Sequence, residues 1–142
     1  MALPSPRPGL VIGYSYLWRD EADRGVDEGR KDRPCVVVLT VRTIGGETVV
    51  TVAPITHTPP TRPENAVFLP SSTKARLGLD DQPSWIATND LNQFTWPGFD
   101  LRAIRRGSDR FDHGMLPELL IHQLRDSVLT QLRASRTRIT SR

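Results

Sequence analysis

Two β-branched, apolar segments flank a pair of adjacent glycines, and this arrangement constrains the fold more than any other feature of the sequence. Residues 36–41 and 47–56 are rich in Val, Ile and Thr, which favour extended strands. Gly45 and Gly46 between them are typical of a two-residue hairpin turn, because such turns need positive φ angles. We therefore expect an antiparallel hairpin at the centre of a mainly β domain.

The length of the turn determines which residues of the hairpin face each other. A two-residue turn places Cys35 opposite Thr56. Arg33 then lies two residues further out on the same face, because side chains alternate with a period of two. Diagonal neighbours in such a ladder are roughly 7–8 Å apart, within reach of an arginine. The hairpin is thus predicted to bring Arg33 and Thr56 together at its open end, unless a bulge near Pro54 changes the register.

These residues by themselves allow two interpretations of the pair. Arg33 can be a solvated arginine at a strand end and Thr56 an ordinary strand residue, and the pattern alone favours this interpretation. Alternatively the pair is functional, since an arginine fork matches phosphate geometry and is always charged. A threonine hydroxyl beside it can bind the phosphate or orient a ribose 2′-hydroxyl.

Three segments of the chain have the order and spacing of a known protein family. They are Gly29-Arg30-Lys31-Asp32-Arg33-Pro34 before an apolar strand, Val52-Ala53-Pro54-Ile55-Thr56 at the end of the next strand, and Asp90-Leu91-Asn92 followed by Trp96-Pro97-Gly98. In this combination the chain resembles the PemK/MazF family of toxins from type II toxin–antitoxin systems. The resemblance extends from about Pro8 to the last expected helix.

The resemblance implies both a fold and a function. The implied fold is a mainly β, SH3-like small β-barrel with a C-terminal helix, here as a single domain over residues 1–142. The implied function is that of an mRNA interferase, a homodimeric endoribonuclease that cleaves single-stranded RNA without a metal or other cofactor. The implied partner is an antitoxin with a disordered, acidic binding segment, in a toxin–antitoxin complex that binds DNA.

The same resemblance assigns catalytic roles. The family's catalytic arginine corresponds to Arg33 and its catalytic threonine to Thr56. Some members also use an aspartate in a later strand-to-loop segment, which corresponds to Asp90. Those members carry a basic residue two positions earlier, where this sequence has Thr88, so their acid/base constellation is incomplete here.

Further residues are expected to contact the RNA, namely Trp18, Arg30, Lys31, His57 and Arg62. Trp18 ends the first expected strand, residues 10–18, where its ring is available for core packing or for stacking on a base. Arg30 and Lys31 belong to a charged loop that ends beside the predicted site. His57 and Arg62 lie in a proline-rich segment expected to form a wall of the groove. The predicted register turns His57 away from the face of Thr56, which favours a substrate contact over catalysis.

Composition limits the remaining possibilities. The formal net charge of +3 suits a polyanionic partner without proving one. Cys35 is the only cysteine, so an internal disulfide framework is excluded. The sequence contains no phosphate-binding glycine loop and no His/Cys cluster with metal-ligand spacing. Without an evident signal peptide or an apolar run long enough for a bilayer, we expect a cytoplasmic protein with no membrane contact.

The rest of the chain is expected to complete the barrel and add one helix. Short strands are predicted at residues 66–69 and 85–88, and a turning segment at 90–98. A helix is predicted from Pro117 to about Arg133, where apolar residues recur at every fourth position: Leu116, Leu120, Leu124, Val128 and Leu132. Residues 1–8 and 134–142 are expected to be loose tails.

Two other functions remain open. A CcdB-like gyrase poison shares the architecture, but that group ends in an aromatic, tryptophan-containing tail, whereas this sequence has Ile139-Thr140-Ser141-Arg142. A non-catalytic module that binds RNA or protein on an SH3-like barrel is the third possibility. An RNA cleavage assay separates all three.

Overall fold

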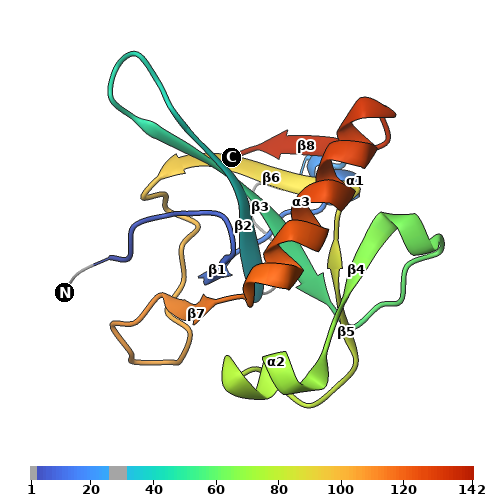
Figure 1. Ribbon diagram of the computed structural model, residues 1–142. Coiled ribbons are helices and arrows are strands. Elements are labelled where there is room, and N and C mark those ends of the chain that lie inside the picture. Colours follow the sequence, from blue (N-terminus) through green and yellow to red (C-terminus); the bar gives the residue numbers. More distant parts are fainter. Residues whose placement is uncertain (1–2, 26–31) are drawn as a thin grey trace.

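The described part of the chain forms a curled sheet covered by helices (Figure 1). The structure is a computed structural model that describes residues 3–25 and 32–142. Within these residues the strands are β1 (Leu10–Tyr14), β2 (Arg33–Arg42), β3 (Thr48–Thr56), β4 (Ala66–Leu69), β5 (Ser84–Ala87), β6 (Asp90–Trp96), β7 (Asp112–Met115) and β8 (Arg138–Ser141). The helices are α1 (Arg19–Asp23), α2 (Ser71–Arg76) and α3 (Glu118–Arg133), with a 3₁₀ turn at Pro63–Asn65.

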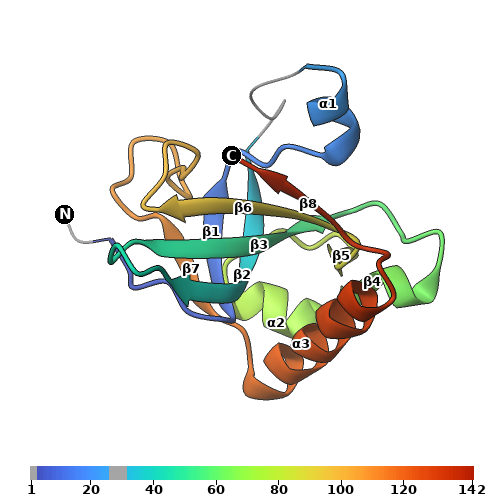
Figure 2. The same cartoon turned by 90° about the horizontal axis from the view of Figure 1, so that it is seen from above.

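The sheet runs in the order β4-β5-β3-β2-β1-β7, and β6 adds to it by pairing with β3 and β8. Its pairs are antiparallel except for β6 with β8, which are parallel. Figure 2 shows α2 and α3 on one side of the sheet and α1 on the other. The fold class is therefore confirmed as mainly β, with a curled half-barrel sheet and a C-terminal helix.

Each face of the sheet carries its own apolar core. On one face, the buried side of α3, including Leu120, Leu124 and Val128, belongs to a cluster with Val36 and Ile86 of the sheet. On the other face, a second cluster gathers aromatic and aliphatic residues of β1, β2, β3 and β6, among them Tyr14, Tyr16, Cys35, Val52 and Phe94. The alternation of side chains along β2 explains this division, because neighbouring residues point to opposite faces.

The central hairpin forms, but its register differs from the predicted one. The ladder begins at Arg42–Thr48, so the loop is longer than two residues, and Gly46 in it has a φ of +86°. A bulge between Val37 and Leu39 then shifts the pairing by a further residue. Cys35 consequently lies opposite Pro54 rather than Thr56. The physical reason is that one longer loop and one bulge each move the register by one residue, and a two-residue turn allows for neither.

These two shifts act in the same direction, so the face on which each residue lies is preserved. The β2–β3 ladder ends at Cys35–Pro54. Continued outward, the same register places Arg33 directly opposite Thr56 instead of on the diagonal. Beyond Pro54, β3 pairs with β5 through Ile55–Ile86 and Thr56–Trp85. Neither Pro34 nor Pro54 has an N–H to donate, which accounts for the end of the β2–β3 ladder at this point.

Two predicted irregular segments are in fact strands. Residues 90–98, expected to turn the chain, contain β6, which pairs with β3 over Thr48–Val52. Residues 134–142, expected to be a loose tail, contain β8, which pairs with β6 through Asp90–Arg138 and the next three positions. The prediction failed because these segments are polar, and their order depends on partners distant in sequence.

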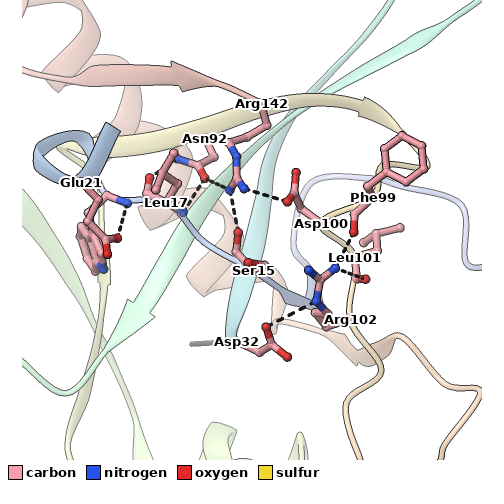
Figure 3. A network of polar contacts seen from close by, with 11 residues as sticks. Ser15, Leu17, Glu21, Asp32, Asn92, Phe99, Asp100, Leu101, Arg102 and Arg142 are labelled. Atoms are coloured by element: carbon pink, nitrogen blue, oxygen red, sulfur yellow. Dashed lines mark hydrogen bonds and ion pairs between the residues drawn. The ribbon is translucent and has the colours of Figure 1, made fainter. Parts of the chain in front are cut away.

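Arg142 follows β8 and fastens it to the sheet, as Figure 3 shows. Its guanidinium donates to the Ser15 carbonyl at 2.6 Å, to Asn92 Oδ1 at 3.2 Å and to Asp100 Oδ1 at 2.7 Å. Its side chain is only 3% exposed. Asn92 is also buried, and its amide bonds the backbone of Leu17 through both Nδ2 and Oδ1. These polar contacts replace the apolar side chains on which strand prediction depends.

The other predicted elements agree more closely with the structure. Helix α3 begins at Glu118, one residue after the predicted Pro117, which is its N-cap, and it ends at Arg133. Strand β4 spans the predicted residues, and β5 begins and ends one residue earlier than expected. The first strand ends at Tyr14 rather than at Trp18. Residues 3–9 have no regular secondary structure.

Candidate active site

A cavity of about 470 Å³ opens where β2 and β3 separate. Its walls at the strand ends are Asp32, Arg33 and Pro34 on one side and Ile55, Thr56 and His57 on the other. The rest of the lining comes from the loop after β3, from the α2–β5 segment, from β1 and from the region before and within β7: Thr58, Lys74, Gly78, Leu79, Asp80, Ser84, Gly13, Ala103, Ile104 and His113. The structure thus brings Arg33, Thr56 and His57 to one cavity.

Arg33 is held against an aromatic ring. Its guanidinium carbon lies 5.2 Å from the centroid of the Trp18 ring, a cation–π contact. Trp18 in turn packs edge-on against the buried Tyr16, with 5.0 Å between ring centroids. Arg33 Nε is buried and has no hydrogen-bond partner among the described residues. A buried donor without a partner is uncommon in folded proteins.

The hydroxyl of Thr56 is oriented by its own turn. Thr56 Oγ1 accepts a hydrogen bond from Thr58 N at 3.1 Å. This leaves the hydroxyl proton available for donation to another oxygen. Thr56 is half-buried at the end of β3, where its backbone pairs with Trp85. The arrangement favours a hydrogen-bond donor at this position of the cavity.

His57 belongs to a chain of hydrogen-bonded polar groups. Its Nε2 lies 2.8 Å from Asp80 Oδ2, and Asp80 Oδ1 accepts from Lys74 Nζ at 2.5 Å. The Lys74 side chain is 3% exposed, and its ammonium also donates to the Gln82 carbonyl and to Ser84 Oγ. The hydrogen bond from Lys74, reinforced by Gln82 N and His57, lowers the pKa of Asp80 below its ordinary value. Asp80 is therefore a carboxylate at neutral pH that faces an imidazole.

A close approach of backbones closes the cavity on the side of β1. Gly13 lines the cavity and accepts a hydrogen bond from Arg102 N at 2.9 Å. A Cβ at this glycine would collide with the Arg102 carbonyl oxygen, so a side chain is not tolerated here. The Arg102 guanidinium also pairs with Asp32 at 3.5 Å, as Figure 3 shows. These contacts fix the first residues of β2 beside the segment that precedes β7.

Comparison with known proteins identifies the family. The family model described as PemK-like, MazF-like toxin of type II toxin–antitoxin system matches residues 17–95, more than half of the chain. The chain belongs to this toxin family. The match includes the strand ends that carry Arg33 and Thr56 and the segment that carries Asp80. Comparison with curated proteins returned no match. Membership supports a toxin role and implies an antitoxin partner.

The other residues predicted for the site of this toxin lie apart from the cavity or outside the described residues. Asp90 does not line it; its carboxylate accepts from Tyr16 Oη at 2.5 Å and from Arg19 N at 3.2 Å, and burial raises its pKa. Arg62 is exposed and lies 3.9 Å from Glu64. Arg30 and Lys31 fall outside the described residues. Catalysis by Asp90 and RNA contacts by Trp18, Arg30, Lys31 and Arg62 stay predictions.

A smaller, cationic cavity adjoins the first one in the toxin. It measures about 210 Å³ and shares Gly78, Ile104 and His113 with the larger cavity. Arg76, Arg105 and Arg110 also line it. Burial lowers the pKa of His113, which bonds the Leu77 carbonyl through Nδ1 at 3.1 Å. The two cavities share three lining residues and both are lined by arginine; together they are called the arginine-lined depression.

Two structural findings bear on metals and membranes. Across residues 3–25 and 32–142, no cluster of three or more His, Cys, Asp or Glu side chains has a geometry that would hold a metal ion. In the same residues, no helix combines the length and apolarity needed to cross a bilayer.

Sequence reasoning missed Lys74 and Asp80. They occupy α2 and the loop after it, a segment in which the sequence shows only loop and single-turn character. A fully buried lysine has no sequence signature of its own. The available signal was that Lys74 is one of only two lysines in a chain otherwise rich in arginine. In a chain whose basic residues are nearly all arginine, a lysine is a candidate for a site that needs the compact ammonium.

Proposed function

We propose that this toxin is an mRNA interferase that cleaves single-stranded RNA without a metal, in the cavity between β2 and β3. The observation that carries the proposal is that Arg33 and Thr56 line one cavity, with the Arg33 guanidinium held against the Trp18 ring. These are the two residues to which the family resemblance assigns catalysis. Arginine and threonine suffice to bind a phosphodiester, which is the group that the reaction changes.

The role of Arg33 follows from the chemistry of RNA cleavage. When the 2′-hydroxyl of a ribose attacks the adjacent phosphorus, negative charge accumulates on the non-bridging oxygens. A guanidinium provides parallel N–H donors that match two such oxygens, and it stays charged at every accessible pH. The Trp18 ring restrains the guanidinium from one face. Restraint before the substrate arrives is what makes such a donor effective in the transition state.

Thr56 complements the arginine as a neutral donor. Because Oγ1 already accepts from Thr58 N, its proton can be directed at a phosphate oxygen. A threonine hydroxyl is too weak an acid to lose its proton at neutral pH, so it is not available as an alkoxide base. The proposal therefore gives Thr56 the task of binding and orienting the phosphate, and it leaves proton transfer to another group.

The toxin is proposed to act as a cytoplasmic homodimer under the control of an antitoxin. Apolar side chains remain exposed along α3, including Leu119 at 72% and Leu129 at 39%. A third cavity, of about 310 Å³ between β2 and α3, is lined mainly by apolar residues. These surfaces support association with another copy or with an apolar part of the antitoxin. The acidic segment of the antitoxin would compete with RNA phosphates for the arginine-lined depression.

The decisive experiment is cleavage of labelled RNA in excess chelator. We expect single-stranded RNA to yield fragments with 2′,3′-cyclic phosphate and 5′-hydroxyl ends, while duplex RNA and strands carrying 2′-deoxyribose at the cleaved position stay intact. The variant Arg33→Ala, verified as folded, should lose about 10²–10³ in rate. Cleavage that disappears on chelation and returns with a divalent ion would refute the proposal. Inhibition of gyrase supercoiling without RNA cleavage would favour the CcdB-like alternative.

A further inference from the structure

We propose that His57 is the general base of this cleavage and that Asp80, anchored by Lys74, positions it. The inference deepens the proposed function and rests on it. The carrying observation is the unbroken chain from a buried ammonium to a carboxylate to an imidazole that lines the same cavity as Arg33 and Thr56.

The contact with Asp80 determines which ring nitrogen of neutral His57 carries the proton. Nε2 faces a carboxylate that can only accept hydrogen bonds, since Asp80 is ionised at neutral pH. A neutral His57 therefore holds its proton on Nε2, and Nδ1 keeps its lone pair. That is the form of imidazole that can take a proton from a hydroxyl.

The position of Asp80 depends on Lys74. Half of the Asp80 side chain is exposed, at 49%, whereas the Lys74 side chain is 3% exposed and donates to three oxygens. Burying an ammonium is costly unless its partners are well placed. Two of these partners belong to the loop before β5 and to β5 itself, so Lys74 fixes the loop that carries Asp80. An exposed carboxylate thereby gains one defined position facing His57.

Several charged or titratable groups line the cavity with His57. His57 directly follows Thr56, and together they continue the line of β3 along the cavity. The charged or titratable groups that line the cavity around it are Asp32 and Arg33 of the β2 side, Lys74 and Asp80 of the α2–β5 segment, and His113 of β7. His113 bonds the Leu77 carbonyl. Of these groups, Asp80 is the one whose hydrogen bond to His57 the structure shows.

The chemical step balances without any added reactant except water. His57 Nδ1 takes the proton of the ribose 2′-hydroxyl as the 2′-oxygen forms its bond to phosphorus. The bond from phosphorus to the 5′-oxygen breaks, and a water molecule donates a proton to that leaving oxygen. The resulting hydroxide removes the proton from His57. The products are a 2′,3′-cyclic phosphate and a 5′-hydroxyl, and the imidazole is restored with Asp80 still ionised.

The test is the pH dependence of single-turnover cleavage between about pH 5 and pH 8, the range in which an ordinary imidazole changes charge. The wild-type rate should rise with pH through one ionisation. The variant His57→Ala should lose about 10²–10⁴ in rate and lose that rise. Added imidazole should restore part of its rate. The control is Asp126→Ala on the exposed side of α3, which should keep the wild-type rate and profile.

The variant Asp80→Asn distinguishes a role of Asp80 in positioning His57 from a role in holding the fold alone. It removes the negative charge that favours the imidazolium, so the midpoint of the rise should move to lower pH and the maximal rate should fall. The neighbouring variant Asp81→Asn should leave both unchanged. Lys74→Met keeps the negative charge of Asp80 and removes a nearby positive charge, so the midpoint should not move to lower pH, while the maximal rate should fall because Asp80 loses its anchor. Circular dichroism and thermal melting establish that each variant is folded.

The outcomes distinguish the two levels of the proposal. A wild-type toxin that cleaves RNA while His57→Ala retains its rate and profile refutes the base and leaves the ribonuclease intact. A wild-type toxin that cleaves no RNA refutes both. Independently of activity, nitrogen NMR of the wild-type toxin should find the neutral His57 protonated on Nε2. Protonation on Nδ1 would overturn the assignment whatever the kinetics.

Discussion

Removal of the buried charge at Arg142 should destabilise the fold more than any other single arginine substitution outside the cavity. The guanidinium holds Asp100, whose side chain is 19% exposed, together with the Ser15 carbonyl and the amide of Asn92. Arg142→Met keeps the length of the side chain and removes these donors. Breaking a buried ion pair by removing one partner costs about 3–5 kcal/mol, because the other charge stays desolvated. Asp100 keeps some access to water, so we expect the lower end, about 3 kcal/mol.

Urea and thermal denaturation measure this effect directly. For a domain of this size, about 3 kcal/mol corresponds to a decrease in Tm of roughly 6–12 °C. Arg138→Met is the matched control, because Arg138 begins β8, the strand that Arg142 follows, its side chain is 70% exposed and it lies 3.9 Å from Asp23. It should cost less than about 1 kcal/mol. Replacing Asp100 by Asn in the Arg142→Met background should recover part of the loss. Equal stability of the two single variants, within about 0.5 kcal/mol, would refute the reasoning.

Three further results are expected. Thr56→Val should lower the single-turnover rate by about 10²–10³ with little change in RNA affinity, because it removes a donor and keeps the shape; a comparable decrease in affinity would assign Thr56 to binding alone. Replacing Arg105 and Arg110 by Gln should weaken RNA binding, while bound RNA is still cleaved at the wild-type rate. The slope of log K for RNA binding against log salt concentration should fall by about 1 for each RNA phosphate that the variant no longer neutralises. Burial lowers the pKa of His113 below its ordinary 6.5, so the folded toxin binds fewer protons there than the unfolded chain, and its stability should fall as the pH drops below 6.5 through the lowered pKa. His113→Asn should lose that part of the pH dependence, as urea titrations near pH 7.5 and pH 5 would measure.

The elements that sequence predicts well are those with strong local signals. The repeat of leucines along α3 and the β-branched runs of β2 and β3 each indicate their own structure. The short apolar strand β4, residues 66–69, does the same. In each case the buried face can be deduced from spacing alone, because burial and period agree.

Elements whose stability comes from distant polar partners are not predictable in this way. Asn92 is typical of a turn by residue type, yet it is buried in β6 and bonds both polar groups of the Leu17 backbone. Strand β8 exists beside it through main-chain pairing and through Arg142. Nothing local in these segments specifies a strand, and their partners are at least 40 residues away.

The candidate site was predictable only in part, for the same reason. Arg33 and Thr56 follow from the hairpin and from the family resemblance, and His57 follows Thr56 in sequence. Lys74 and Asp80 come to the cavity through α2 and a loop whose position is set by β4 and β5. Their relation to His57 is a tertiary contact across 23 residues, and no spacing rule produces it.

Pro54 is the residue at which the sequence argument and the structure differ most instructively. From sequence it is the weak point of the hairpin, since a proline interrupts a ladder. In the structure the ladder does end there, opposite Cys35, and Pro34 on the facing strand cannot donate either. If the ladder continued, residues 32–34 and 55–57 would form backbone hydrogen bonds with each other. Instead all six line the cavity, with Arg33 and Thr56 at its facing walls. The two prolines thus end the β2–β3 pairing and leave an opening between the strands. The register of the ladder still aligns Arg33 with Thr56, so these two residues face each other across the space that a substrate would occupy.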